Sequence, residues 1–329
     1  MKFGAFIPQG WTLDLVGVPV DRQWATMVEV ATTLESLGFE SGWVYDHFHT
    51  VPEATQEPTY EAWSLMAALA ASTTTLRLGQ MCTCNGYRPP AYLAHVAASV
   101  DVISGGRLEM GIGAGWYSEE FRAHGYEFPK ASVRLGQLAE GVEIMKRMWT
   151  EDEASFEGEH FHLAGARCQP KPLQDPHIPF WIAGGGERRT LNIAARYASY
   201  TNFAGTPEEF AHKSAVLKGH CEDVGTDFST ITRSMNMSLV CAETEAEAMA
   251  ILDDVEGRGR SVVSDEDGLR RFLAEARRRS GPPDKIIEQI RPYADVGMGY
   301  LILRVSDAAY GTSGIELFGR EVISQLGER

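Results

Sequence analysis

The sequence predicts an α/β fold of one domain, a (β/α)8 TIM barrel over residues 1–329. Helical and strand patterns alternate from one end of the chain to the other, and eight strand patterns can be distinguished. Neither a sequence repeat nor a linker marks a second domain. With 329 residues, 44% of them hydrophobic, the chain is long enough to bury the core of such a barrel.

Short apolar runs, bounded by glycine, proline or polar residues, mark the strands. The first begins at Lys2 and is interrupted by Pro8, and the second runs through Trp43-Val44-Tyr45. The other six lie at 76–84, 107–113, 180–183, 200–203, 231–241 and 300–305. In such a barrel the carboxyl ends of all strands form one rim, where ligands of this fold bind.

Apolar residues at helical spacing fill the intervals between the strands. The first helix spans 21–37 and is closed by Gly38, which supplies a left-handed stop. Thr206-Pro207-Glu208-Glu209 combines a cap, a first-turn proline and two acids, so it predicts a helix start. Thr244 and Glu247 predict a capping box for a further helix.

Two segments depart from the alternation. Between 151 and 179, glycine, proline and histidine interrupt short apolar pairs, which indicates a small insertion of strands and loops after the fourth strand and helix. Residues 257–281 form a charged, arginine-rich helical segment toward the C-terminus. Its composition fits either a mobile lid or a solvated surface helix.

Composition limits the partners and the compartment. The formal net charge of -15 argues against nucleic acid or an anionic membrane as a partner. Five cysteines with no CxxC pair indicate reduced, buried thiols. The first strand begins at once, without the pattern of a signal peptide or a membrane span. We therefore expect a soluble cytoplasmic enzyme with a small-molecule substrate.

Polar residues and glycines gather where the predicted strands end. Asp46 and His47 follow the second strand, and we interpret them either as ligand contacts or as a turn cap with a core histidine. The other candidates on the rim are Met81, Cys82, Thr83, Gly113, Ala114, Gly115, Gly184, Gly185, Gly186 and Asn202. Together they predict a cofactor-shaped ring of residues.

Two glycine-rich segments, 111–115 and 184–186, each lie between a strand and a helical pattern. Their amides can cradle a phosphate, or the glycines can serve only the dihedral angles of a tight turn. The second segment favours the phosphate because Arg188 and Arg189 follow it. A metal site is not expected, because His160 and His162 have no Cys or acid partner at zinc spacing. No Gly-x-Ser-x-Gly elbow is present either.

Taken in order, these motifs resemble the luciferase-like flavin and deazaflavin oxidoreductases, in particular the branch that uses coenzyme F420. The resemblance runs over almost the entire chain. It is carried by residues 41–48 (SGWVYDHF), 76–79 (LRLG), 87–90 (YRPP), 101–107 (DVISGGR), 113–116 (GAGW), 156–158 (FEG), 170–172 (PKP) and 182–188 (IAGGGER).

The resemblance implies a TIM barrel that holds a tricyclic ring at the carboxyl ends of its strands. It implies that Asp46 contacts the cofactor and that His47 faces the reactive edge of the ring, where an imidazole can donate or accept a proton near neutrality. It also implies a non-prolyl cis peptide at Met81–Cys82. The cofactor's phosphate contacts would be Gly115, Glu119, Gly184, Gly185, Glu187 and Arg188, and similar proteins are commonly homodimers.

One departure concerns the substrate. Related F420-dependent sugar-phosphate dehydrogenases carry a catalytic glutamate where this chain has Trp116, so that activity is not transferred. Trp116 is instead expected to wall a substrate pocket with Trp11, Tyr87 and Asn202. The leading hypothesis is an F420-dependent oxidoreductase with His47 as the catalytic residue. The alternatives are an FMN-dependent luciferase-like monooxygenase and a non-catalytic cofactor-binding protein.

Overall fold

The computed structural model describes residues 1–327 and confirms the predicted barrel. The last two residues of the predicted domain, 328–329, lie outside the described residues. The barrel strands are β1 (Lys2–Phe6), β2 (Ser41–Val44), β3 (Arg77–Gln80) with β4 (Thr83–Cys84), β5 (Leu108–Gly113), β8 (Phe180–Ala183), β9 (Tyr200–Asn202), β10 (Thr232–Leu239) and β11 (Tyr300–Val305). Every pairing among them is parallel, and β3 and β4 both pair with β5 to close the ring.

The third barrel strand is interrupted, which the continuous pattern at 76–84 did not predict. Between β3 and β4 the peptide bond from Met81 to Cys82 is cis, as expected at this position. Thr83 and Cys84 then resume pairing with β5, opposite Ile112 and Gly113. The interruption lies at the carboxyl-end rim.

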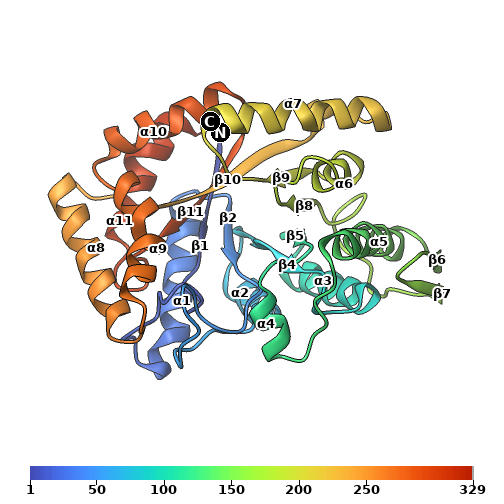
Figure 1. The fold of residues 1–329 in the computed structure, drawn as a ribbon, viewed down its shortest axis with the longest axis horizontal. Coiled ribbons are helices and arrows are strands. Elements are labelled where there is room, and N and C mark those ends of the chain that lie inside the picture. Colours follow the sequence, from blue (N-terminus) through green and yellow to red (C-terminus); the bar gives the residue numbers. More distant parts are fainter. Residues whose placement is uncertain (328–329) are drawn as a thin grey trace.

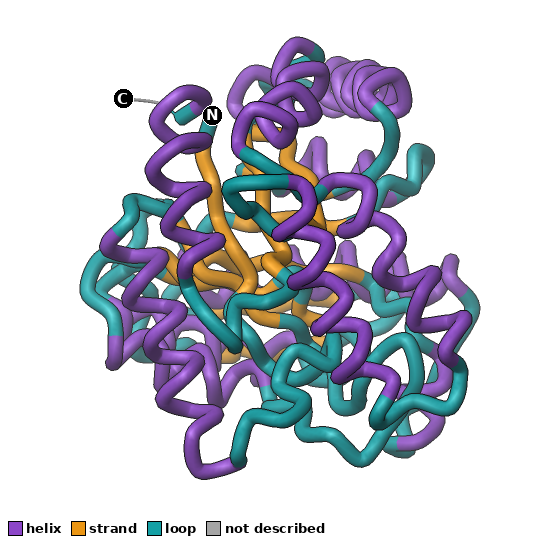
Figure 2. The backbone as a smooth tube through the Cα atoms, turned by 90° about the vertical axis from the view of Figure 1, so that its left-hand side faces the viewer, coloured by secondary structure: helices purple, strands orange, loops and turns teal. Residues whose placement is uncertain are grey.

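Helices surround the strands, as Figures 1 and 2 show. They are α1 (Val20–Ser36), α2 (Ala62–Ser72), α3 (Pro90–Ser104), α4 (Ser118–Ala123), α5 (Ala131–Thr150), α6 (Thr190–Tyr197), α7 (Pro207–Val224), α8 (Glu245–Arg260), α9 (Glu266–Arg279), α10 (Pro283–Asp295), α11 (Ser313–Phe318) and α12 (Ser324–Leu326), with the short turns η1 (Phe228–Thr230) and η2 (Gly319–Ile323). Both predicted helix starts are confirmed: Thr206 with Glu209, and Thr244 with Glu247, form capping boxes. No helix among residues 1–327 is long and apolar enough to cross a membrane.

The core has two parts. The larger part fills the layer between the strands and the helices and contains most of the buried aliphatic side chains. The second part lies inside the barrel and is mainly aromatic: Phe6, Trp43, Tyr45, Met81, Trp181, Tyr300 and Ile302. Since large rings occupy the interior, the barrel is packed below the rim and only its upper end is open to a ligand.

The two irregular segments have different structures. The insertion forms an antiparallel hairpin of β6 (Ala154–Glu157) and β7 (His162–Ala166), which lies beside α5 at one edge of the molecule in Figure 1. The arginine-rich segment forms the last turn of α8 and all of α9. Leu269 and Leu273 of α9 are buried against Leu13 and Val16. The helix is thus amphipathic and packed on one face, as in the surface-helix interpretation.

Candidate active site

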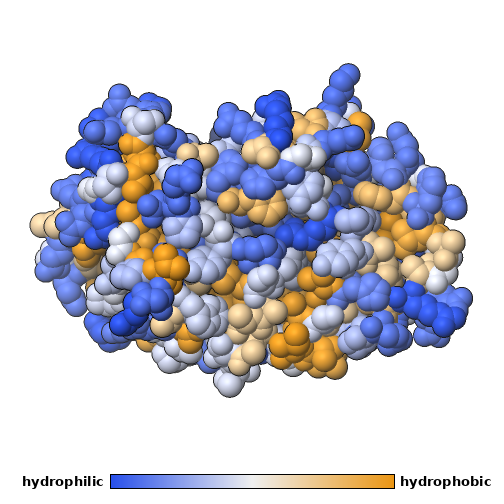
Figure 3. All heavy atoms as spheres, turned by 90° about the horizontal axis from the view of Figure 1, so that it is seen from below, coloured by the Kyte–Doolittle hydropathy of each residue, from blue (hydrophilic) through white to orange (hydrophobic). Residues whose placement is uncertain are grey.

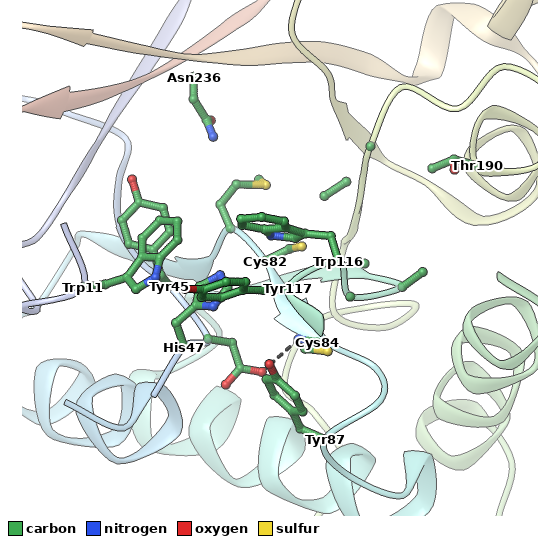
Figure 4. Close-up of a pocket in the computed structure, with 17 residues that line it drawn as sticks. Trp11, Tyr45, His47, Cys82, Cys84, Tyr87, Trp116, Tyr117, Thr190 and Asn236 are labelled. Atoms are coloured by element: carbon green, nitrogen blue, oxygen red, sulfur yellow. Dashed lines mark hydrogen bonds between the residues drawn. The ribbon is translucent and has the colours of Figure 1, made fainter. Parts of the chain in front are cut away.

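A cavity of about 400 Å³ opens at the carboxyl-end rim (Figure 4). Residues from strand ends and from the loops that follow them form its wall. They are Trp11, Tyr45, Asp46, His47, Met81, Cys82, Cys84, Tyr87, Gly113, Ala114, Gly115, Trp116, Tyr117, Ala183, Gly184, Thr190 and Asn236. Most of the residues predicted for the cofactor ring are therefore in one place, although their sequence positions are far apart.

His47 is held from two sides within this cavity. Its imidazole stacks on the indole of Trp11, with ring centroids 4.2 Å apart and planes 2° from parallel. Its Nδ1 lies 2.7 Å from Oε2 of Glu120. The side chain is 12% exposed, and its Nε2 has no hydrogen-bond partner within residues 1–327. His47 is therefore fixed in orientation, with one ring nitrogen left for a ligand.

Glu120, which the sequence analysis did not single out, anchors this arrangement. It is fully buried, and its carboxylate accepts hydrogen bonds from the Tyr87 hydroxyl (2.6 Å) and the Phe48 amide (2.7 Å) as well as from His47. Burial alone would raise the pKa of Glu120, but the bond from His47 and the other hydrogen bonds lower it to about 2. The carboxylate is therefore ionised at neutral pH.

The ionised carboxylate decides the roles of the two imidazole nitrogens. A carboxylate only accepts hydrogen bonds, so Nδ1 of His47 must carry a proton and donate it. A proton can then be gained or lost only at Nε2, the nitrogen without a partner in the described chain. This carboxylate–histidine pair suits general acid–base chemistry at the rim.

Asp46 lines the cavity, but its carboxylate is engaged by the protein. Both oxygens accept from Arg88, at 2.7 and 2.9 Å, and Oδ2 also accepts from the Cys84 amide at 2.8 Å. The residue therefore ties the end of β2 to β4 and to the start of α3. In this structure it positions His47 and the floor of the cavity; the predicted cofactor contact stays a prediction.

The cis peptide between Met81 and Cys82 lies in the wall of the cavity. Burial, with a smaller contribution from Asp46, raises the pKa of the Cys82 thiol to about 12. At neutral pH this cysteine is a thiol and not a nucleophile. Thr83, which was predicted to contact the cofactor, does not line the cavity; it is fully buried and its hydroxyl donates to Gln80 Oε1 at 2.8 Å.

Two glycine turns, residues 113–115 and 184–186, reach the same cavity. Gly113, Ala114 and Gly115 line it from β5, and Gly184 lines it from β8. Gly115 and Gly184 have φ of +79° and +117°, so these turns do require glycine for their dihedral angles. Within residues 1–327 the amides of Gly115, Trp116, Gly185 and Gly186 donate no hydrogen bond. The two interpretations of these glycines are thus compatible: the turns need glycine for their dihedral angles, and their free amides can also bind an anion.

The remaining predicted phosphate contacts lie outside the cavity lining. Gly185, Gly186, Glu187 and Arg188 continue the second turn. Glu187 accepts from His212 at 3.0 Å, whereas Arg188 is exposed and has no ionic partner within the described chain. Arg189 donates to the Ser132 carbonyl at 2.8 Å. On α4, Glu119 is exposed and outside the lining, and its neighbour Glu120 points inward.

The comparison with protein families identifies the scaffold. The model of the luciferase-like monooxygenases matches residues 1–299. The chain belongs to this family. Its members are oxidoreductases or monooxygenases, so the prediction of an enzyme is confirmed.

Relatives of this luciferase-like protein use different cofactors. It is 26% identical to an F420-dependent glucose-6-phosphate dehydrogenase of Amycolatopsis mediterranei, over 84% of this chain and 87% of the relative. It is 25% identical to an FMNH(2)-dependent dimethylsulfone monooxygenase of Pseudomonas putida, over 100% of this chain and 96% of the relative. Among solved structures, an F420-dependent secondary alcohol dehydrogenase in complex with an F420-acetone adduct has a TM-score of 0.77 at 22% identity, covering 97% of each chain.

Of the four residues predicted for the substrate pocket of this luciferase-like protein, three line the cavity and one does not. Trp116 is 64% exposed at the cavity mouth and stacks on Tyr117. Trp11 packs against His47, and Tyr87 uses its hydroxyl for Glu120. Asn202 does not line the cavity but donates to Asn236, which does. No group of three or more His, Cys, Asp or Glu residues within 1–327 is placed to hold a metal ion.

Asn236 and Glu120 are the two missed residues that matter most for the chemistry of the site; the lining residues Tyr45, Cys84, Tyr117, Ala183 and Thr190 were not predicted either. Ser234, Asn236 and Ser238 alternate along β10 between apolar residues. Such a period of two places polar side chains on one face of a strand, so this pattern could have revealed Asn236. For Glu120, the six-residue length of α4 left too few positions to show which of two adjacent glutamates faces inward.

Proposed function

We propose that this protein is an F420-dependent oxidoreductase in which His47 assists proton transfer. When bound, the deazaflavin would exchange a hydride between its C5 atom and a small organic substrate. The observation that carries the proposal is the His47–Glu120 pair, which lies in one cavity with the cis peptide at Met81–Cys82 and both glycine turns. This combination provides a proton-transfer group beside space for a planar ligand.

The residues present fit such a cofactor. The ring would lie between His47 and the Met81–Cys82 peptide, both in the wall of the 400 Å³ cavity. The phosphate would lie at the amides of Gly115, Gly185 and Gly186, which donate to nothing else in the described chain. Arg188, exposed next to the second turn, supplies a cation for it.

Within this proposal the protein's own residues orient and exchange a proton. Glu120 keeps Nδ1 of His47 protonated and stabilises the imidazolium form. Nε2 then donates a proton to the substrate or accepts one from it, depending on the direction of the reaction. The rings of Trp11, Trp116 and Tyr117 surround the imidazole and limit the access of water to it.

Replacement of His47 tests this role. His47→Ala should lower turnover by about 100-fold or more, the usual scale of general acid–base catalysis. Its unfolding curve and its affinity for the cofactor should stay near those of the wild type. His95→Ala, an exposed position on α3, is the matched control. Full activity of His47→Ala with any accepted substrate would remove His47 from the mechanism.

An FMN-dependent monooxygenase is the second candidate. This candidate is favoured by the Pseudomonas putida relative, whose alignment covers all of this chain. The same fold accommodates both chemistries, so the choice depends on the site and not on the barrel. We place F420 first because Asp46, His47 and Phe48 match the pattern of the F420 branch.

We also propose that the protein is a cytoplasmic homodimer. Its five cysteines are free thiols, as in reducing compartments. Tyr92 and Ile103 of α3 are exposed apolar side chains beside a surface groove between α2 and α3. Figure 3 views the side on which these helices lie in Figure 1, and hydrophobic patches are visible there. Light scattering on the purified protein gives the mass; a monomer at micromolar concentration would contradict the proposal.

A further inference from the structure

We infer that Asn236 is a specificity residue whose amide nitrogen binds an acceptor oxygen of a neutral aromatic carbonyl substrate. The inference rests on the proposed function, because it assigns a substrate class to the same cavity. It depends on two independent features of the described residues. One is a chain of hydrogen bonds that fixes which end of the Asn236 amide faces the cavity, and the other is the charge and chemistry of the cavity wall.

The hydrogen-bond chain starts from the backbone carbonyl of Thr201, which can only accept a hydrogen bond. The Ser234 hydroxyl donates its single proton to the Thr201 carbonyl at 2.8 Å. Its oxygen is then free to accept, and Nδ2 of Asn202 donates to it at 3.0 Å. This assigns the two ends of the Asn202 amide. Both Ser234 and Asn202 are buried, so the chain is shielded from water.

The orientation of the Asn202 amide determines that of the Asn236 amide. Nδ2 of Asn202 directs its second proton to Oδ1 of Asn236, at 3.0 Å. Because Oδ1 of Asn236 is held as an acceptor, its Nδ2 is the atom left for the cavity, and it has no partner within residues 1–327. Figure 4 shows the Asn236 side chain extending from β10 toward the other lining residues. The cavity therefore presents a directed amide donor.

The wall of the cavity excludes one class of substrate. No lysine or arginine is among the lining residues, and the one carboxyl group among them, that of Asp46, is paired with Arg88. A phosphorylated or carboxylated substrate would lose its hydration and find no permanently charged counter-ion among the lining residues, where the only basic side chain is the His47 imidazole. This argues for an uncharged substrate.

Aromatic side chains favour a planar apolar body for the ligand. Tyr45, Trp116 and Tyr117 line the cavity in addition to Trp11, and Trp116 projects at its mouth with 64% of its surface exposed. Such rings contribute apolar area and stacking geometry to a planar ligand. With the directed Asn236 amide placed among these rings, the site matches an aromatic ring that bears a carbonyl oxygen.

The test compares two probes of similar shape, acetophenone and ethylbenzene, which differ by the carbonyl oxygen. Ligand-observed NMR titration of the F420-loaded protein gives both dissociation constants. Asn236→Leu should reduce the preference for acetophenone over ethylbenzene by about three- to tenfold relative to the wild type, the range for one net hydrogen bond. Asn192→Leu on α6, outside the cavity, should leave the preference unchanged.

A second variant should reverse the orientation of the Asn236 amide without changing residue 236 itself. In Asn202→Asp the new carboxylate can only accept, so the Asn236 amide should turn its nitrogen to residue 202 and its oxygen to the cavity. The preference for acetophenone should fall, and 1-phenylethanol, which donates a hydrogen bond, should bind more tightly than in the wild type. An unchanged preference in both Asn236→Leu and Asn202→Asp would overturn the inference.

Cofactor titrations separate this inference from the proposed function. Quenching of F420 fluorescence by each variant should give the wild-type dissociation constant. A loss of cofactor affinity in Asn236→Leu with no change in probe preference would assign the amide to the cofactor and overturn the inference. If the wild type does not bind F420, the proposed function fails, while the probe preference measured on the cofactor-free protein still decides the role of Asn236.

Discussion

At the scale of single residues, the central unit is the pair of His47 and Glu120. A histidine after a strand is a common feature, and alone it indicates neither catalysis nor structure. The buried carboxylate changes this, because it fixes the tautomer of the imidazole and stabilises its protonated form. The same carboxylate accepts the Phe48 amide, so it also positions the loop that carries His47.

Glu120→Gln tests the contribution of the charge. The amide keeps the size of the side chain but no longer stabilises the imidazolium, so turnover should fall by about tenfold or more. The pH–rate profile should also change, since the charge that faces Nδ1 of His47 is removed. Glu119→Gln, one residue earlier and exposed, is the control and should keep the wild-type profile. Identical profiles for the two variants would refute the role of Glu120.

The depressed pKa of Glu120 also predicts an effect on acid stability. The pKa falls from 4.5 to about 2 on folding, so the ionised form stabilises the native state above pH 4.5. This contribution, about 3 kcal/mol at most, is lost as the pH falls from about 4.5 to 2. Urea denaturation at pH 7 and pH 3 should show a smaller loss for Glu120→Gln than for the wild type. Equal losses would mean that the carboxylate is not preferentially stabilised in the folded protein.

At the scale of elements, the sequence predicted the strands and helices well where their patterns are long. The alternation of β10 and the capping box of α7 could be recognised because several residues repeat the same signal. The split between β3 and β4 could not be recognised from the apolar pattern, since a change in one peptide bond leaves that pattern intact; the cis peptide at this position was expected only from the family resemblance. Likewise, α4 is too short for its pattern to show that Glu120 points inward. The break between β3 and β4 and the orientation of Glu120 both belong to the candidate site.

The turn after β5 offers a test of close packing at the site. A Cβ atom on Gly115 would lie 2.7 Å from Cys84 Sγ and 2.8 Å from the Phe121 ring, whereas one on Gly125 would meet nothing within 4 Å. Both glycines have a positive φ, of +79° and +75°. Gly125→Ala should therefore cost about 1 kcal/mol of unfolding free energy, and Gly115→Ala clearly more. Equal costs in urea denaturation would show that the turn is loosely packed.

At the scale of the whole molecule, the barrel explains why distant motifs act together. The loop after β2 contributes His47, the turn after β5 contributes Gly115, and β10 contributes Asn236, and the parallel order of the strands brings all three to one rim. The family and the fold could be predicted from the sequence, because an ordered series of motifs runs along the chain. The cofactor could not be decided in this way, since one scaffold serves several reactions.

The most direct measurement of the central claim is a parallel titration of the purified wild-type protein with F420 and with FMN, each followed by the fluorescence of the cofactor. We predict saturable quenching of F420 at micromolar concentration and much weaker binding of FMN. Binding of F420 should weaken when Gly115→Ala narrows the turn. Tight binding of FMN without binding of F420 would contradict the account and establish the flavin-dependent alternative.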